Sequence, residues 1–368
     1  MPKQNSCYQF QDFDKILPAP YCMYIDIEAI LEKQETPITS STTKLQKHIP
    51  AAIGTLIIPS SDLKAEPIET ANQYKSFVGV DCIREFRNYL IETCKSIYDW
   101  TKINSHMLAN RKRSEDIKAF DEADKCQQCK RSFENDKVWH HNHNNGEFIG
   151  ALCSTCNLKI EQSRRSLTIV CHNLKNYDLH HILLSGLCDD KRISLKPIAQ
   201  TSEKYLALTA SYYFPVESSW SHEIKSSKKK NSIRFDMRFI DSCAFMTSSL
   251  ASLVKTLPQA DLVNTLKMLQ IYKNLSVDTI SEKGIFPYSY FDSLDKMQVA
   301  ELPPQSAFFD TLTRDELSDR DYSMAIRAWN EFECRTLGEY MERYLELEMR
   351  LLQMFLKILG RLQCKKMA

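Results

Sequence analysis

The stretch YCMYIDIEAIL at residues 21–31 is an apolar run that contains two acidic residues, Asp26 and Glu28. Its composition predicts a buried β-strand, and the β-branched stretch AAIGTLIIP at residues 51–59 predicts a second strand paired with it. Residues two apart in a strand share a face, so both carboxylates should lie side by side. Burial of unpaired carboxylates is costly, and a divalent cation would offset that cost. A solvent-exposed pair is the alternative.

Periodicity outward from this stretch predicts an α/β fold. Apolar residues recur at three- and four-residue spacing over residues 80–108, which predicts a helix. Further strands are predicted at residues 166–174, 204–214 and 233–242, and further helices at residues 177–187, 248–257 and 336–362. Residues 283–313 are rich in proline and aromatic residues and predict an irregular segment. Strands followed by helices that cover them are typical of an α/β domain.

Residues 110–165 interrupt this pattern, because they are charged and rich in Cys, His and Asn. Four cysteines form two CxxC pairs separated by 23 residues: Cys126, Cys129, Cys153 and Cys156. This spacing predicts a structural Zn²⁺ with four thiolate ligands. We therefore expect an inserted module whose core is a metal ion instead of an apolar cluster.

The composition of the whole chain sets wider limits. Lys plus Arg (48) nearly balances Asp plus Glu (47), so net charge identifies no partner. Basic runs occur at residues 111–113, 164–165 and 225–230, and the last of these is expected to be a solvated loop. Thirteen cysteines with one CxxC array favour a reducing compartment, and no signal peptide or membrane span is recognisable. We expect an intracellular protein of the nucleus or cytoplasm that does not enter a membrane.

Two later stretches add acidic residues to the first pair. HNLKNYD at residues 172–178 follows a predicted strand and places Asp178 at the start of a helix. YLELE at residues 344–348 places Tyr344 and Glu348 four residues apart, on one face of the closing helix. An ordinary helix cap and a surface glutamate are the alternatives for Asp178 and Glu348. The combination and its order favour a shared metal site.

In this order the three stretches resemble the 3′-5′ exonuclease motifs of family B DNA polymerases, particularly the protein-primed branch of Polinton/Maverick elements, viruses and organelles. Further stretches at residues 238–254, 283–293, 302–313 and 336–352 resemble the same branch. The resemblance implies a ribonuclease H-like exonuclease fold with a helical C-terminal part, and a viral or mobile-element origin.

By this resemblance Asp26, Glu28 and Asp178 would bind Mg²⁺ or Mn²⁺, and Tyr344 would orient the attacking water. Asn173 and Ser242 would hold the single-stranded 3′ end of DNA. The chain departs from the family at Glu348, where the family has aspartate. The extra methylene moves that carboxylate, which would weaken or abolish hydrolysis unless the side chain adjusts.

The inserted module resembles the endonuclease VII branch of the HNH nucleases, a small zinc-bound ββα fold, on CxxC, the stretch WHHNHNNG at residues 139–146, and CxxCN. This resemblance would make His141 the general base, with His143 supporting it, and Asn157 a ligand of the catalytic metal. His140 stands where that family has an acidic ligand. The alternative is a zinc-stabilised DNA-binding knob without hydrolytic activity.

These features predict four parts of the chain: residues 1–109 and 166–257 for the exonuclease domain, 110–165 for the zinc module, and 258–368 for an irregular segment with the closing helix. The motifs of a polymerase palm are not found in these residues. The expected function is 3′-5′ exonucleolytic proofreading within a DNA polymerase, with a polymerase part or a terminal protein supplied separately. A catalytically inactive DNA-binding remnant and an HNH endonuclease are the alternatives.

Overall fold

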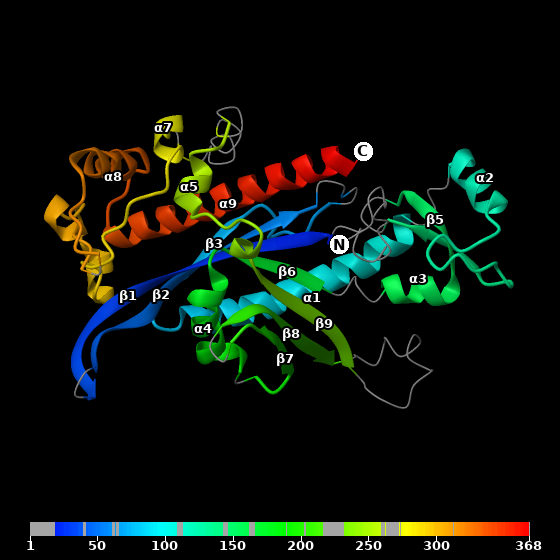
Figure 1. Cartoon of the computed structure of the whole chain (residues 1–368), viewed down its shortest axis with the longest axis horizontal. Coiled ribbons are helices and arrows are strands. Elements are labelled where there is room, and N and C mark those ends of the chain that lie inside the picture. Colours follow the sequence, from blue (N-terminus) through cyan, green and yellow to red (C-terminus); the bar gives the residue numbers. More distant parts are fainter. Residues whose placement is uncertain are drawn as a thin grey trace, which may run out of the picture.

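The computed structural model describes residues 19–367 except 40–41, 61–62, 64–65, 109–112, 143–145, 162–165, 189, 202–203, 216–231, 259–261, 263–271, 273 and 312. Its centre is a seven-stranded sheet with the strand order β3-β2-β1-β6-β9-β8-β7 (Figure 1). The strands are β1 (Tyr21–Thr39), β2 (Thr42–Pro59), β3 (Tyr74–Val78), β6 (Ser166–Cys171), β7 (Ile193–Ala199), β8 (Tyr205–Pro215) and β9 (Ser232–Asp241). The expected α/β class is confirmed.

The sheet is mixed. β1, β6 and β9 run parallel, whereas β2, β3, β7 and β8 pair antiparallel with their neighbours. Tyr24 is in register with Val170, and Cys171 is in register with Asp241. The loops that follow β6 and β9 therefore leave the sheet at one level, just beyond Tyr24 in the first part of β1. In sheets with parallel strands, this carboxyl edge is where ligand sites form.

Each face of the sheet is covered by a long helix. Helix α1 (Cys82–Leu108) packs Phe86 and Leu90 against one face, in a core that includes Ile25 and Ile27 of β1. Helix α9 (Leu337–Met367) covers the opposite face together with α5 (Leu250–Val254). Alternate residues of β1 thus face different helices, as the period of a strand requires. Asp26 and Glu28 belong to the face that α9 covers.

Gly54 allows α9 to approach the sheet at the level of the acidic pair, because it lies opposite Asp26 in the β1–β2 ladder. A Cβ atom at this position would collide with the Met349 methyl group and would lie 3.5 Å from Leu345 Cβ. A larger residue at this position would force the Met349 side chain to move, so glycine favours the close contact between β2 and α9.

The inserted module forms a separate small sheet between α1 and β6 in the chain, to one side of the main sheet (Figure 1). Its elements are α2 (Ser114–Glu122), β4 (Lys137–His141), β5 (Phe148–Cys153) and α3 (Ser154–Glu161). Trp139 packs between Phe120 and Phe148, with ring centroids 5.4 and 4.3 Å away. The order of β4, β5 and α3 is the expected ββα order.

The predicted helices mostly form where the periodicity places them. α1 and α9 match the segments 80–108 and 336–362, and α5 is shorter than predicted. The single helix predicted after Tyr177 instead divides into α4 (Asp178–Ile182) and a π-helical turn (Leu183–Leu187). The remaining short helices are α7 (Val277–Ile280), α8 (Asp319–Glu331) and the 3₁₀ turns Leu174–Asn176, Ser242–Ala244, Leu294–Gln298 and Gln305–Phe308. Among the residues described, no helix has the length and apolar character of a membrane span.

Candidate active site

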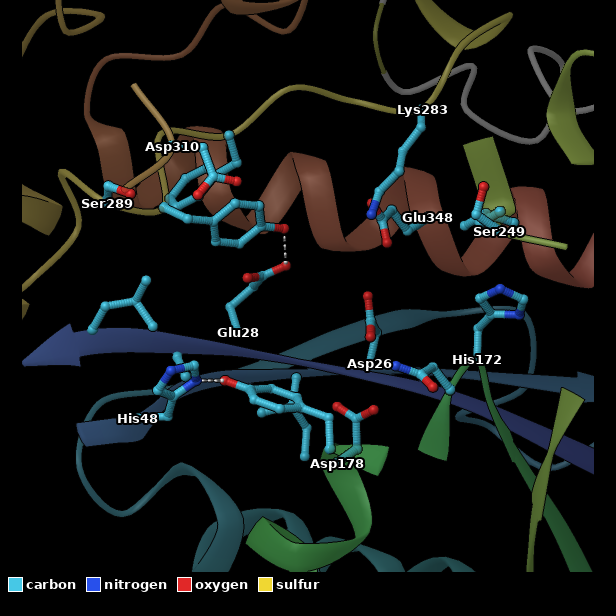
Figure 2. A pocket seen from close by; sticks show the side chains of 18 of the residues that line it. Asp26, Glu28, His48, His172, Asp178, Ser249, Lys283, Ser289, Asp310 and Glu348 are labelled. Carbon is cyan, nitrogen blue, oxygen red and sulfur yellow. Dashed lines mark hydrogen bonds and ion pairs between the residues drawn. The ribbon is translucent and has the colours of Figure 1, made fainter. Parts of the chain in front are cut away.

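A pocket of about 650 Å³ opens between β1, the loop after β6, α9 and the segment 283–310. Figure 2 shows Asp26 and Glu28 rising from β1, Glu348 and Lys283 approaching from the side of α9, and Asp178 at the start of α4. All four predicted carboxylates line this pocket. Residues that are far apart in the sequence are therefore brought together as the sequence analysis expected.

The four carboxylates are largely shielded from solvent. Glu28, Asp178 and Glu348 are 4, 3 and 8 % exposed, and Asp26 is half-buried. Burial, reinforced by the charge of Glu348, raises the pKa of Asp26 and of Glu28 well above the usual range. Burial also raises the pKa of Asp178 to about 7, although a hydrogen bond from Cys171 opposes the rise. Such crowding of like charges favours a bound cation.

The donor set fits a divalent metal. One oxygen each of Asp26 and Asp178 and the sulfur of Cys171 lie within 4.8 Å of one another. Carboxylate oxygens are the ligands that Mg²⁺ and Mn²⁺ prefer. Asp26 and Asp178 are thus close enough to share such an ion, and Glu28 and Glu348 line the same pocket.

Lys283 is a pocket residue that the sequence analysis did not single out, although it begins the quoted segment 283–293. Its ammonium nitrogen lies 3.1 Å from Glu348 Oε1. Burial lowers the pKa of Lys283, but the charges of Glu348 and Asp26 outweigh it and raise that pKa. Among the described residues that line the pocket, Lys283 is the one lysine, and none is an arginine.

Two tyrosines connect the closing helix to the acidic pair. Tyr344 Oη lies 3.0 Å from Tyr288 Oη, which lies 3.4 Å from Glu28 Oε1. Tyr344 is 4 % exposed. Its ring rests on Gly284, where a Cβ atom would come within 2.5 Å of the ring. The predicted water-orienting residue therefore reaches the pocket through Tyr288, which sequence reasoning missed.

Asp241 shapes the loop that carries Asn173. Its carboxylate accepts hydrogen bonds from the backbone N–H groups of Asn173 (3.0 Å), Lys175 (3.1 Å) and Cys243 (2.9 Å). Asn173 takes a left-handed backbone conformation, with φ of 67°, and lines the pocket. Asp241 immediately precedes Ser242, and its position at the end of a buried strand is the signal that could have identified it.

The predicted DNA-contacting residues lie at different depths. Asn173 is on the pocket wall, whereas Ser242 is fully buried behind it. Ser242 Oγ lies 2.9 Å from His172 Nδ1 and 3.2 Å from the Cys171 carbonyl oxygen. Ser242 therefore fixes the position of the His172 ring, and it is His172 that lines the pocket.

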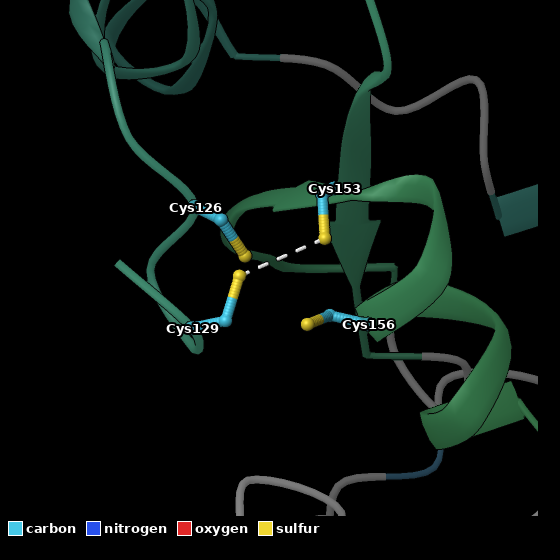
Figure 3. A group of neighbouring side chains, drawn as sticks. All are labelled: Cys126, Cys129, Cys153 and Cys156. Carbon is cyan, nitrogen blue, oxygen red and sulfur yellow. Dashed lines mark hydrogen bonds between the residues drawn. The ribbon is translucent and has the colours of Figure 1, made fainter. Parts of the chain in front are cut away.

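The four cysteines of the inserted module converge as predicted (Figure 3). Their sulfur atoms lie within 4.8 Å of one another, and Cys129 and Cys153 are 3.8 Å apart. Burial opposes ionisation of Cys153, but hydrogen bonds from Cys156, Arg131 and Cys126 together outweigh it and lower the pKa of Cys153 to about 6. The cluster could hold a metal ion such as Zn²⁺.

The HNH-like residues are partly brought together. His140, on β4, is 3 % exposed, and its Nδ1 lies 3.2 Å from Asn157 Oδ1 on α3. His141 follows on β4, after an irregularity in its pairing with β5. His143 lies outside the described residues, as do Arg111, Lys112 and the basic runs at residues 164–165 and 225–230.

Comparison of the chain with protein-family models, curated proteins and solved structures finds no significant match. The fold and the two sites define an α/β protein with an acidic, metal-compatible pocket and a separate four-cysteine centre. The chemistry of these two sites is therefore what bears on its function.

Proposed function

We propose that this chain is the 3′-5′ exonuclease part of a family B DNA polymerase of the protein-primed type. The observation that carries the proposal is the convergence of Asp26, Glu28, Asp178 and Glu348 in one pocket. The mixed sheet, with its antiparallel β1–β3 meander continuing into parallel β6 and β9, is compatible with the ribonuclease H-like fold that the proposal requires.

Different residues of the pocket would have different roles in phosphodiester hydrolysis. Mg²⁺ or Mn²⁺ held by the carboxylates would supply charge stabilisation at the attacking and leaving oxygens. Tyr344 and Tyr288 provide a hydroxyl pair beside Glu28, where a water molecule can be oriented. The Lys283 ammonium supplies positive charge near a bound phosphate, and Asn173 offers an amide to the DNA end.

The proposed substrate is a single-stranded 3′ end of DNA. The polymerising part, and any terminal protein that primes synthesis, would act as separate partners. The zinc module would contact the same DNA, with its metal serving to hold β4, β5 and α3 together.

The test uses zinc-loaded protein with oligonucleotides labelled at the 3′ or the 5′ end, in Mg²⁺ and in Mn²⁺. We expect shortening from the 3′ end that disappears in Asp26→Ala/Glu28→Ala. The matched control is Glu115→Ala/Asp116→Ala, which removes one exposed and one half-buried acid of α2, outside the pocket. Degradation that persists in the Asp26→Ala/Glu28→Ala protein would show that the nuclease is a contaminant or uses another site.

A DNA-binding protein without hydrolysis is the second candidate, and the ion pair between Lys283 and Glu348 favours it. Lys283 already neutralises the one carboxylate that departs from the family pattern. This candidate predicts tight binding of single-stranded DNA and no metal-dependent cleavage by the wild-type protein.

An HNH endonuclease is the third candidate, and the contact between His140 and Asn157 favours it. Such an enzyme cuts within closed circular DNA, which an exonuclease cannot attack. Nicking of a circular substrate that is lost in His141→Ala and retained in Asp26→Ala/Glu28→Ala would support it.

A further inference from the structure

Cys171 lies at the base of the acidic pocket and has no part in the hydrolysis proposed above. It is the last residue of β6 and is fully buried. Its thiol donates a hydrogen bond to Asp178 Oδ2, with 3.2 Å between sulfur and oxygen. With Asp26 and Asp178 it forms a group of three ligand atoms within 4.8 Å of one another.

The sulfur atom of this group is a ligand atom that a thiophilic divalent ion prefers. Zn²⁺ binds thiolate at about 2.3 Å and carboxylate oxygen at about 2.0–2.2 Å, which places a sulfur and an oxygen ligand of a tetrahedral ion roughly 3.5–3.7 Å apart. The sulfur–oxygen distance of 3.2 Å between Cys171 and Asp178 would have to lengthen by only about 0.3–0.5 Å to reach that separation. Small side-chain rotations would bring Asp26 onto the same ion. Mg²⁺, in contrast, takes oxygen ligands in octahedral geometry.

The charge distribution calls for a cation here independently of the thiol. Asp178 is 3 % exposed. In the part of the chain that the structure describes, Lys283 forms its ion pair with Glu348 and not with Asp178. Figure 2 shows Asp178 and Glu348 on opposite sides of β1, with Asp26 between them. The positive charge of Lys283 is therefore directed to the α9 side of the pocket, and the side of Asp178 and Cys171 receives less of it.

We propose that Cys171 makes this position a mixed sulfur–oxygen site for a thiophilic divalent ion of the Zn²⁺ class, which inhibits hydrolysis by displacing Mg²⁺ or Mn²⁺. On binding, the thiol proton passes to solvent and a metal–thiolate bond forms, with no change in oxidation state. The inhibition rests on the proposed exonuclease, but the ion site itself does not. The affinity of mixed sites for Zn²⁺ exceeds that for Mn²⁺, so low Zn²⁺ concentrations suffice.

The test is calorimetric titration of Zn²⁺ into protein whose four-cysteine centre is already loaded with zinc. Wild-type protein should bind one further ion, and Cys171→Ser should bind it at least tenfold more weakly. Titration in two buffers of different ionisation enthalpy should show about one more proton released by the wild type than by Cys171→Ser.

Cys243→Ser is the matched control, because the Cys243 thiol also lines the pocket but lies 3.5 Å from His172 Nε2, outside the group of three. It should leave Zn²⁺ binding unchanged. If serine at this buried position prevents folding, Cys171→Ala takes its place. Asp178→Asn should lower the affinity for the same Zn²⁺ ion while the thiol is kept.

Equal Zn²⁺ affinity in Cys171→Ser, Cys171→Ala and wild type would overturn the inference, as would a loss confined to Cys243→Ser. Hydrolysis that Zn²⁺ inhibits equally in wild type and Cys171→Ser would overturn the inhibitory role alone. Zn²⁺ binding that depends on Cys171, in a protein without hydrolysis, would retain the site and contradict only the proposed exonuclease.

Discussion

The ammonium nitrogen of Lys283 lies 3.1 Å from Oε1 of Glu348, inside a pocket that four carboxylates share. The side chains of Lys283 and Glu348 are 36 and 10 % exposed. This ion pair joins the irregular segment after α7 to the closing helix, and it supplies the positive charge that a metal ion would otherwise provide. Lys283 therefore both stabilises the metal-free pocket and competes with a metal for Glu348.

Replacement of Lys283 should reveal this competition. We expect Lys283→Met to destabilise the metal-free protein by about 1–3 kcal/mol, because Glu348 then stays buried without its partner. Added Mn²⁺ should raise its melting temperature more than that of the wild type. Lys296→Met is the control, since Lys296 pairs with Asp292 on the adjoining segment. A Mn²⁺ response equal to that of the wild type would contradict the idea.

Under the proposed function, shortening Glu348 should restore the carboxylate position of the exonuclease motif that the sequence resembles. Misplacement of a reacting group by about 1 Å can cost on the order of a hundredfold in rate, so Glu348→Asp should raise the rate of 3′-end hydrolysis by roughly tenfold or more. Glu346→Asp is the matched control on α9, because Glu346 is buried against Arg350 and Tyr272. The measurement is single-turnover degradation of a labelled oligonucleotide. An equal or slower rate for Glu348→Asp would show that the longer side chain already fits.

The contact between Gly284 and Tyr344 offers a test of water positioning. Gly284→Ala would press a methyl group against the Tyr344 ring, whereas Tyr344→Phe keeps the ring and removes only its hydroxyl. Both variants should lower the rate of 3′-end hydrolysis about tenfold to a hundredfold, because a misoriented attacking water slows a reaction by roughly that factor. Tyr344→Phe should change stability by only about 1 kcal/mol. An unchanged rate for Tyr344→Phe, measured in the same assay, would remove Tyr344 from the mechanism.

The buried carboxylates predict a characteristic pH dependence of stability. The ordinary pKa of an aspartate is 3.8, and burial raises the pKa of Asp178 to about 7 in the folded protein. Between these two pH values the folded state therefore binds more protons than the unfolded state. The contribution of Asp178 to the stability of the metal-free protein should therefore be fully present below about pH 4 and should be lost as the pH rises to about 7. Asp26 and Glu28 act in the same direction.

Thermal unfolding in metal-free buffers, with zinc retained in the module, measures this slope. Mg²⁺ should flatten it, because a bound cation favours the ionised carboxylates, and Asp178→Asn should reduce it. Stability that rises between about pH 4 and about pH 7 in the absence of Mg²⁺ would contradict the burial argument.

Removal of metal from the cysteine cluster should unfold the module while the main sheet persists. Apart from the partly buried aromatic group of Phe120, Trp139 and Phe148, the buried apolar cluster of the module is Cys126, Leu152, Cys153 and Cys156 with Phe133, which is too little apolar surface for independent stability. A chelator should therefore abolish protection of the β4–β5 amides from hydrogen exchange and leave those of β1 and β6 protected. Cys126→Ser should behave alike without chelator, whereas Cys188→Ser, at an exposed cysteine outside the cluster, should not. Protection of β4 and β5 in Cys126→Ser would show that metal does not hold them.

The sequence alone identified much of this architecture. The shared face of Asp26 and Glu28 follows from the period of a strand, and the cysteine cluster follows from local spacing, so neither needs knowledge of distant contacts. Tyr344 and Glu348 could be placed together for the same reason, because a helix sets their spacing.

Other residues became visible only in three dimensions. Lys283 and Tyr288 acquire roles through partners far away in the chain, and nothing in their immediate neighbours indicates those partners. The strand Ile193–Ala199 was not predicted, because it is an edge strand with Lys196 and Pro197 and lacks clear alternation. The strand Tyr74–Val78 is also an edge strand, and of its residues only Phe77 is buried.

The distribution of the pocket over the chain has a consequence for how the protein matures. Tyr288 contacts Glu28 across 260 positions, and the parallel partner of β1 follows the whole zinc module. Contacts of such long range form slowly, because loop closure precedes the gain from pairing. A chain whose synthesis has not yet reached α9 would carry Asp26, Glu28 and Asp178 without Tyr344 or Glu348. If the chain is the proposed exonuclease, nascent and partly refolded molecules would therefore be unable to degrade DNA, and hydrolysis would begin only when the last helix docks.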